Sequence, residues 1–225
     1  MLNSNLYQLA YSIYNNALNS ESSTLVSIGD ISDVRGGKRL PKGVNLQTTP
    51  NNHPYIRVRD LNDAVVLHIN SEFEYVDDET QKGISRYIVN TSDVLISIVG
   101  TIGLTAIVHS SLDTANLTEN CVKITNLKSA FPEYILLFLR SKEGQEAIAR
   151  GTVGAVQAKL PLKNIQSINI PLLSEDVMIA LQEQLVPLFN RIADNTSENM
   201  KLTSLRDTLL PKLMSGEIDL SDIDI

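Results

Sequence analysis

Cysteine, tryptophan and long hydrophobic runs are scarce in this sequence. Its 225 residues include one cysteine, Cys121, and no tryptophan. One cysteine excludes a disulfide within the chain and is typical of a reducing compartment. The longest apolar run, residues 94–108, spans 15 residues and contains glycines and hydroxyls, so it is too short to cross a membrane. Because no leader of signal-peptide form is visible either, we expect a soluble, cytoplasmic protein.

Catalytic and cofactor-binding patterns are also missing. The three histidines, His53, His68 and His109, are scattered without metal-ligand spacing, and Cys121 lies in a strand-like segment. The stretch RGGKRLPKG, residues 35–43, lacks the spacing of a phosphate-binding loop, and no G-x-G-x-x-G occurs. We therefore expect a chain that is not an enzyme, with no catalytic residue, no metal and no cofactor of its own.

The net charge of −7 is unevenly distributed along the chain. Residues 25–170 hold 15 basic and 15 acidic side chains, whereas residues 171–225 hold 4 basic and 10 acidic ones. Within the neutral part, two segments have basic side chains and no acidic ones: residues 35–59 and residues 147–174. Basic segments on a neutral body indicate a phosphate-rich partner. The alternative is a solvated surface on which charges happen to cluster.

The pattern of residues 24–170 is typical of a domain that mixes short strands with helices. One amphipathic segment, residues 132–150, predicts a helix with Pro132 in its first turn. The segment 93–99 is continuously apolar and predicts a strand buried on both faces, followed by a turn in which Gly100 and Gly103 take positive φ. Further strands are predicted at residues 55–61, 64–69, 104–108, 121–125 and 166–172. Short strands with few helices predict an α+β domain.

Residues 175–215 form one long helical pattern with apolar side chains every three or four positions. These apolar side chains form one face of the helix, which we call the seam, and Asn195 and Asn199 occupy inward positions in it. Pro187 and Pro211 should kink or divide the helix. About 40 residues at about 1.5 Å each reach about 60 Å, more than the domain can cover. We expect a second helix, most simply from another copy, to cover the seam. The alternative is a helix folded back on its own domain at Pro187.

The same helical pattern occurs at both ends of the sequence. Shifting residues 5–18 by 196 positions places Leu6, Leu9 and Ile13 on Leu202, Leu205 and Leu209. The N-terminal segment therefore predicts a helix of the same kind as the distal part of the long one. We expect the two stripes to pack in one helical bundle.

Five motifs in order carry a family resemblance. They are VSIGDISDVRGGKRLPKG (26–43), PYIRVRDL (54–61), DVLISIVGTIGLTAIV (93–108), GTVGAVQAKLPLKNIQSINIPL (151–172) and LRDTLLPKLMSGEIDL (205–220). With them the chain resembles the specificity (S) subunit of type I restriction–modification systems, in a half-length form with one target recognition domain. A typical member carries two such domains and two helical spacers.

The resemblance implies a prokaryotic, non-catalytic subunit that binds double-stranded DNA. In that family each recognition domain reads one half of a bipartite site, and the spacers pair antiparallel and dock methyltransferase subunits. Those subunits use S-adenosylmethionine to methylate adenine, and a restriction subunit can join. A half-length chain is then expected to act as a homodimer on an inverted repeat, or to pair with a different half. A helix of about 60 Å limits the half-site separation to about 17 base pairs, and we expect about one helical turn.

Candidate DNA-binding residues follow from the basic segments and the resemblance. Arginine and lysine can contact guanine or phosphate, and glutamine can bridge adenine. The candidates are Arg35, Lys38, Arg39, Lys42, Arg57, Arg59, Gln157 and Lys159. For Arg57 and Arg59 the alternative is a pair of outward strand residues facing acidic neighbours.

The dimer and spacer candidates are the seam residues of the long helix. They are Leu181, Leu185, Leu188, Ile192, Asn195, Asn199, Leu202, Leu205 and Leu209. The asparagines fix register at a cost in stability, so replacing both with leucine should stabilise the seam and loosen its specificity. The alternative is an outward polar band.

We expect four regions: an N-terminal helix (1–20), a recognition domain (21–174), a helical spacer (175–216) and an acidic tail (217–225). A competing hypothesis is a helical scaffold that regulates a full-length S subunit without binding DNA itself.

Overall fold

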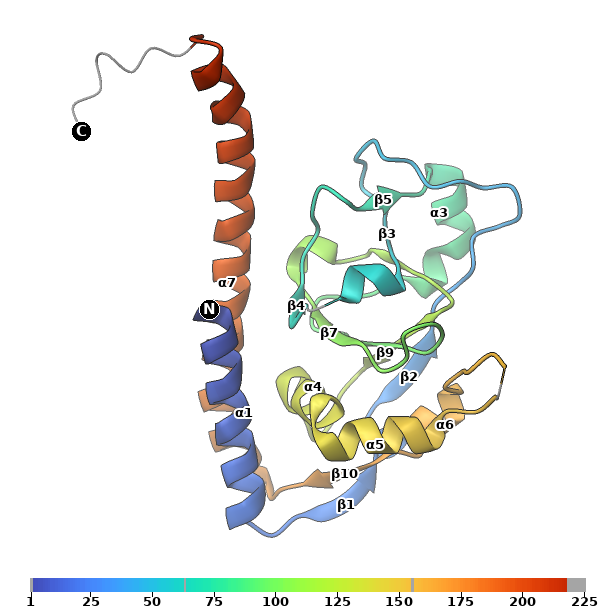
Figure 1. Cartoon of the computed structure of the whole chain (residues 1–225). Coiled ribbons are helices and arrows are strands. Elements are labelled where there is room, and N and C mark those ends of the chain that lie inside the picture. The colour runs from blue at the N-terminus through green and yellow to red at the C-terminus, as the bar shows by residue number, and fades with distance from the viewer. Residues whose placement is uncertain (1, 63, 155, 218–225) are drawn as a thin grey trace, which may run out of the picture.

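Two helices stand side by side along one edge of a mixed domain (Figure 1). The computed structural model describes residues 2–62, 64–154 and 156–217, so the predicted acidic tail beyond Glu217 lies outside the described residues. Helix α1 (Leu2–Ser20) packs on the long helix α7 (Glu175–Met214), and the domain lies between them in sequence. The predicted α+β fold, with an N-terminal helix on a long C-terminal helix, is confirmed.

A five-stranded sheet forms the centre of the domain. Its order is β2 (Asp33–Gly36), β9 (Cys121–Thr125), β6 (Val94–Ser97), β7 (Thr105–Val108) and β4 (Val66–Leu67), antiparallel except between β4 and β7. Every residue of β6, β7 and β9 is buried, which explains the continuous apolar run in the sequence. Gly100 and Gly103 take φ of 78° and 89° in the following turn, as predicted.

Two smaller sheets and several short helices complete the domain. One sheet pairs β1 (Thr24–Ser27) with β10 (Asn169–Leu172), and the other has the order β5 (Glu74–Tyr75), β3 (Pro54–Ile56), β8 (Asn116–Leu117). The helices are α2 (Ile28–Ile31), η1 (Val58–Leu61), α3 (Asp78–Ile84), η2 (Ser85–Tyr87), η3 (Ser110–Leu112), α4 (Pro132–Arg140), α5 (Lys142–Gly151) and α6 (Leu162–Gln166).

Several predicted elements are shorter than expected. The strands predicted at 64–69 and 166–172 are limited to β4 (Val66–Leu67) and β10 (Asn169–Leu172), and two further differences have a clear local cause. The helix predicted at 132–150 breaks at Ser141, whose extended backbone lets its hydroxyl accept a hydrogen bond from the Gly144 amide at 3.1 Å and begin α5. The strand predicted at 55–61 stops at Ile56. The chain then turns into η1, because the Asp60 carboxylate accepts a hydrogen bond from the Arg57 amide at 2.7 Å.

Helix α1 belongs to the core of the domain as well as to the helix pair. Ala10 and Tyr14 are buried, and the Tyr14 ring meets the Tyr134 ring edge-on at 5.2 Å. Tyr134 lies on α4, and its hydroxyl donates to the Pro171 carbonyl at 2.5 Å. The first helix is thus fixed to the body of the domain.

The first half of α7 is covered by its own chain. Seam residues Leu181, Leu185, Ile192 and Asn195 are buried, and Leu188 is half-buried. The expectation that a second copy covers the seam is therefore wrong for this half: α1 and the domain seal it. The helix is also not divided at either proline. Packing of buried side chains on both sides of Pro187 holds that stretch in place.

The second half of α7 projects beyond the end of α1 (Figure 1). Six large apolar side chains are exposed there: Leu202, Leu205, Leu209, Leu210, Leu213 and Met214. Asn199 is exposed as well. Within one chain the stripe of Leu6, Leu9 and Ile13 does not meet that of Leu202, Leu205 and Leu209, because α1 lies against the first half of α7. No helix in the described part of the chain could span a membrane.

The domain contacts the middle of α7 through two histidines. The rings of His68 and His109 stack with centroids 3.8 Å apart, and His68 Nδ1 lies 3.3 Å from Ser197 Oγ on α7. Burial, together with the neighbouring His109, lowers the pKa of His68 to about 4, although Asp194 opposes the shift. The junction therefore holds a neutral imidazole pair.

Candidate nucleic-acid interface

One edge of the central sheet gathers four loops on the side of the domain away from α7 (Figure 1). The Gly37 amide donates to the Cys121 carbonyl at 3.0 Å, and the Ile98 amide donates to the Asn120 carbonyl at 2.8 Å. The Leu160 amide in turn donates to the Ile98 carbonyl at 3.0 Å. We call this surface the loop edge; among the described residues it comprises 37–42, 98–103, 117–120, 152–154 and 156–160.

The first of these loops is anchored at its start. A Cβ on Gly37 would lie 2.0 Å from the Thr118 carbonyl oxygen, so only glycine allows this approach. The Lys38 amide donates to the Leu117 carbonyl, and the Tyr55 hydroxyl donates to the Lys38 carbonyl, each at 2.8 Å. The Lys38 ammonium lies 5.6 Å from the centre of the Tyr87 ring, within cation–π range.

Arg39 lies on the loop edge with an acidic partner. Its Nε is 2.6 Å from Glu119 Oε1, and its side chain is 80% exposed. Burial alone would raise the pKa of Glu119. The hydrogen bond from Arg39, the Glu119 backbone, the Thr118 hydroxyl and the Arg39 charge outweigh burial and lower that pKa. The pair is ionised at neutral pH and open to solvent.

The remaining candidates on or next to the loop edge are exposed. Arg35, on β2, pairs with Asp33 at 2.8 Å, and hydrogen bonds from Asn126 and from Arg35 lower the pKa of Asp33. Lys42, Gln157 and Lys159 are exposed, and no acidic partner of Lys42 or Lys159 is found within the described ranges. Six of the eight predicted residues are thus exposed on β2 or on the loops of the loop edge.

Arg57 and Arg59 lie elsewhere, beside the small sheet of β3 and β5. The Arg57 guanidinium pairs with Glu74 and with Asp60 and is only 17% exposed. Arg59 lies 3.1 Å from Glu74 and is more exposed. This arrangement favours the alternative of arginines facing acidic neighbours, because Arg57 is committed to two carboxylates.

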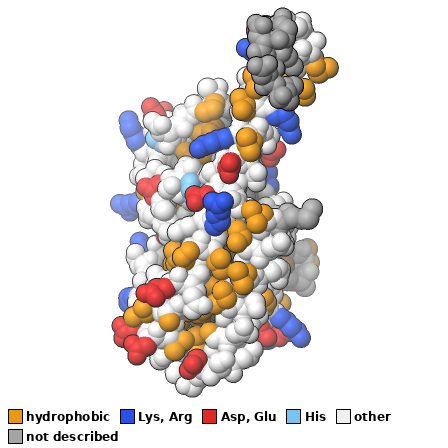
Figure 2. Space-filling view, turned by 90° about the vertical axis from the view of Figure 1, so that its left-hand side faces the viewer, with side chains coloured by type: hydrophobic (Ala, Val, Ile, Leu, Met, Phe, Trp, Pro, Cys, Tyr) orange, Lys and Arg blue, Asp and Glu red, His pale blue; other side chains and the backbone are white. Residues whose placement is uncertain are grey.

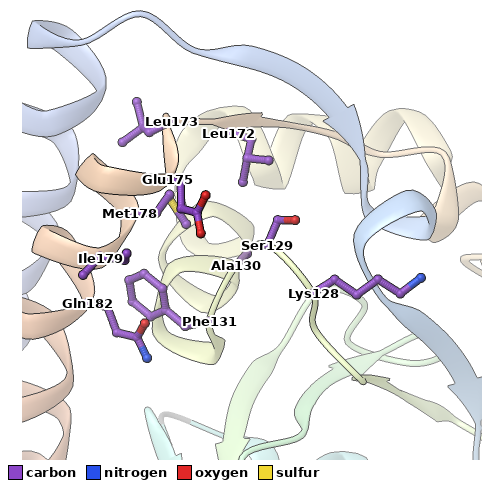
Figure 3. Close-up of a pocket in the computed structure, with 10 residues that line it drawn as sticks. All are labelled: Lys128, Ser129, Ala130, Phe131, Leu172, Leu173, Glu175, Met178, Ile179 and Gln182. Carbon is purple, nitrogen blue, oxygen red and sulfur yellow. The ribbon is translucent and has the colours of Figure 1, made fainter.

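A separate hollow lies where α7 begins (Figure 3). It measures about 420 Å³, and its lining includes Phe131, Leu172, Met178 and Ile179, with Glu175 and Gln182 also on α7. The one basic lining residue, Lys128, points away from the other side chains in Figure 3. Because apolar side chains and the Glu175 carboxylate line the hollow, it is suited to a protein side chain better than to phosphate.

The thiol of Cys121 is buried in strand β9. Burial, with the charges of Asp60 and Glu119, raises the pKa of the Cys121 thiol to about 12, so the thiol stays protonated. No group of three or more His, Cys, Asp or Glu side chains in the described ranges could hold a metal ion.

Comparisons with known proteins point to one family. Residues 20–201 match the family model described as type I restriction modification DNA specificity domain. The chain is 23% identical over 194 residues to the type I restriction enzyme HindI specificity subunit of Haemophilus influenzae, covering 85% of this chain and 41% of the relative. It is 24% identical over 211 residues to the EcoBI specificity subunit of Escherichia coli, covering 92% and 41%.

Solved structures show the same fold. The type I restriction–modification S subunit from M. genitalium superposes with a TM-score of 0.59 at 19% identity, covering 94% of this chain and 53% of that one. The HsdS subunit from Thermoanaerobacter tengcongensis gives 0.56 at 15% identity, covering 96% and 52%. The chain thus spans about 41% of the length of its curated relatives and about half of these structures.

Proposed function

Because this chain belongs to the type I restriction modification DNA specificity domain family, we propose that it is a non-catalytic specificity subunit that binds double-stranded DNA. The match over residues 20–201 carries the proposal, since it includes the whole domain and the first half of α7. The domain reads one half of a bipartite site through the loop edge and the adjoining strand β2, where the exposed Lys42 and Lys159 and the ion-paired Arg35 and Arg39 can meet phosphates and base edges.

The second half of α7 supports self-association. Figure 2 shows apolar side chains gathered along the face formed by α1 and α7. Beyond Asn199 this stripe has no cover within the described part of the chain, and exposed leucines at helical spacing are suited to a partner helix. We propose that two copies pair antiparallel through this half, so that each brings one domain to an inverted repeat.

The same helices are proposed to hold a methyltransferase subunit, which supplies S-adenosylmethionine and the methyl transfer, and a restriction subunit can join that complex. The hollow beside α7 in Figure 3 is a candidate place for such a subunit to insert an apolar side chain. The proposed complex is cytoplasmic and prokaryotic. Its half-sites are proposed to lie about one turn of DNA apart, within the limit of about 17 base pairs that a helix of about 60 Å allows.

Co-expression with a methyltransferase subunit of this type, followed by mapping of methylated adenines, tests the proposal. A bipartite inverted repeat, absent when the chain is omitted, is the expected result. Methylation that does not depend on the chain, with no salt-dependent DNA binding by the complex, would instead favour a scaffold that regulates another S subunit.

A further inference from the structure

The charges of α7 are divided between two parts of the helix. Residues 175–198, the covered half, hold five acidic side chains and one basic one. Residues 199–214, the projecting half, hold three basic side chains and one acidic one. Two projecting halves laid on each other would therefore repel, whereas the projecting half of one copy attracts the covered half of another.

The covered half of α7 has one face that neither α1 nor the domain covers. Exposed side chains recur along it every three or four residues, which places them in one row on the helix. We call this surface the open row; its members are Asp176, Ala180, Glu183, Pro187, Arg191, Asp194 and Glu198. Because Ala180 and Pro187 are small, a further helix with leucine side chains can lie on it.

Two acidic and two basic side chains of α7 have the same spacing. Glu183 and Asp194 in the open row are 11 residues apart, and Lys201 and Lys212 on the projecting half are also 11 apart. Eleven residues make three turns to within about 20°, so each pair spans about 16 Å on one face. Lys212 has an exposed ion pair of 3.5 Å with Glu217, and the other three take part in no ion pair among the described residues.

We propose that the projecting half of each copy lies antiparallel on the open row of a second copy. Lys201 then lies opposite Asp194 of the second copy. In the same register Lys212 lies opposite Glu183 of the second copy. The numbers of opposing residues in an antiparallel pair have a constant sum, which is 395 for both contacts, so one register forms them together. This inference rests on the proposed pairing of two copies and specifies its register.

The register also gives the exposed leucines a place to pack. Leu209 comes beside Pro187 of the second copy. Leu213 comes beside a hollow of about 300 Å³ between α1 and α7, whose lining includes Ile13 and Ala180. The apolar stripe of the projecting half thus meets small side chains and a hollow, while the lysines meet carboxylates.

The two-fold axis of this dimer passes between residues 197 and 198, and its symmetry forms every contact twice. Near the axis, Lys201 comes beside a hollow of about 410 Å³ where α7 meets the domain, and the lining of that hollow includes Asp194 and Glu133. The two Glu198 carboxylates approach each other across the axis, each about one turn from a Lys201 of the other copy. The lysine therefore supplies positive charge to an acidic part of the interface.

Single cysteines near to and far from the axis test the register. Glu198→Cys faces its own counterpart, so mild oxidation of the purified chain should join most of it into a disulfide dimer. Asp207→Cys lies about 28 Å from its counterpart and should give no dimer on a denaturing gel. The native Cys121 is buried. Cross-linking of Asp207→Cys alone would indicate two projecting halves laid on each other, and equal cross-linking of both variants a parallel pair. Either result, or no cross-link at all, would overturn the proposal.

Charge reversal at one contact tests the attraction itself. Glu183→Lys and Lys212→Glu each set like charges opposite each other twice, so each variant should dimerise about tenfold more weakly in sedimentation equilibrium. A mixture of the two variants, and the chain that carries both substitutions, should regain wild-type affinity because opposite charges face each other again. Glu79→Lys and Lys82→Glu make the same changes on the exposed face of α3 and should leave the affinity unchanged.

The outcomes separate this inference from the proposed function. Single variants that dimerise as well as the wild type would overturn the register. Glu183→Lys that keeps the dimer and loses the methyltransferase subunit would assign the open row to that subunit instead. A chain that directs methylation with that subunit but forms no Glu198→Cys cross-link would refute the register alone, and a cross-linked dimer that directs no methylation would refute the proposed function alone.

Discussion

The guanidinium of Arg39 and the carboxylate of Glu119 form an ion pair of 2.6 Å across two loops of the loop edge. Glu119 places a negative charge on the surface that is proposed to meet DNA, which is a polyanion. Its carboxylate also occupies the Nε side of the Arg39 guanidinium. DNA binding must therefore either rearrange this pair or use the remaining N–H groups of Arg39. In both cases Glu119 weakens the general attraction to phosphate.

Glu119→Gln should strengthen binding of the complex to duplex DNA, and Arg39→Ala should weaken it. A released arginine that gains one phosphate contact steepens the dependence of log K on log salt by about 0.9, and loss of such a contact flattens it by the same amount. Titrations at several salt concentrations measure these slopes. Arg191→Ala, which removes an exposed arginine on α7, should leave the slope unchanged. If Glu119→Gln left both affinity and slope unaltered, Arg39 would not lie at the DNA.

Arg57 is expected to act on stability more than on DNA binding. Its guanidinium pairs with Glu74 and Asp60, and Asp60 is itself buried. Arg57→Ala leaves Glu74 and Asp60 with the more exposed Arg59 as their remaining cation, which should lower the free energy of unfolding by about 1–3 kcal/mol. Urea denaturation measures this change. Lys42→Ala on the loop edge is the contrasting variant, with unchanged stability and a flatter salt dependence. A flatter salt dependence with unchanged stability in Arg57→Ala would contradict this assignment.

The sequence predicted most of the features that depend only on residues close together in the chain. Continuous apolar residues predicted the buried strand β6, and the glycines at 100 and 103 predicted its turn. The basic segments predicted exposed cations at Lys42 and Lys159. Arg57 and Arg59 could not be assigned in this way, because their partner Glu74 comes from another strand and is brought in only by the fold. Glu119 is likewise 80 residues from Arg39, so no local signal reveals the pair.

The seam of α7 illustrates a second limit. Apolar periodicity shows that one face of a helix is covered, but the same spacing serves a helix of the same chain and a helix of another copy. Here α1 and the domain cover Leu181 to Asn195, and the stripe beyond is exposed. The sequence offered one sign of this division, since the stripe shifts after Leu202.

The free energy of unfolding should depend on pH through His68, which lies where the domain contacts α7. Its pKa is lowered to about 4 from an ordinary value of 6.5, first by burial and then by His109. The unfolded chain thus binds a proton between pH 6.5 and pH 4 that the folded chain does not. Stability is fully present above pH 6.5 and falls as the pH drops through this window, by at most about 1.4 kcal/mol per unit for one proton.

Unfolding at a series of pH values, with His68→Phe as the variant, tests this linkage. The variant should have a flatter profile between pH 6.5 and pH 4. His109, whose pKa burial also lowers, and Asp194, which favours protonation, face the same junction and retain part of the slope. His53→Gln removes a histidine paired with the exposed Asp78 and is the control. Parallel profiles of wild type and His68→Phe would rule out this role.

The exposed half of α7 should require a partner helix. Leu205→Glu with Leu209→Glu places two charges in the proposed seam, where each leucine contributes about 1.5–3 kcal/mol when buried. We expect the dimer to dissociate at least about 100-fold more readily and the distal turns to lose helicity, because an uncovered helix end is only marginally stable. Light scattering and circular dichroism measure both. As a control, Leu25→Glu on β1 should leave the particle mass measured by light scattering unchanged. A wild-type chain that stays monomeric at high concentration would refute the pairing.

Asn195 should stabilise the contact of α1 with α7 instead of a contact between copies. It is buried, and its Nδ2 donates to Asn3 Oδ1 at 2.9 Å, while Asn3 Nδ2 donates to Thr196 Oγ1 at 3.2 Å. The expectation that leucine stabilises both asparagine positions therefore reverses at this one. Asn195→Leu leaves the half-buried Asn3 oxygen without its donor and should cost about 1 kcal/mol.

Thermal melting of Asn195→Leu beside Asn199→Leu checks this difference. Asn199 is exposed on the half of α7 that projects past α1, so leucine there lengthens the apolar stripe and should raise association without lowering the melting temperature. Asn3→Ala should lower the melting temperature, and adding Asn195→Leu to it should cost less than in the wild type, because the two side chains share one hydrogen bond. Additive effects of the two substitutions would show that the hydrogen bond contributes nothing measurable, and that α1 is held by its apolar face alone.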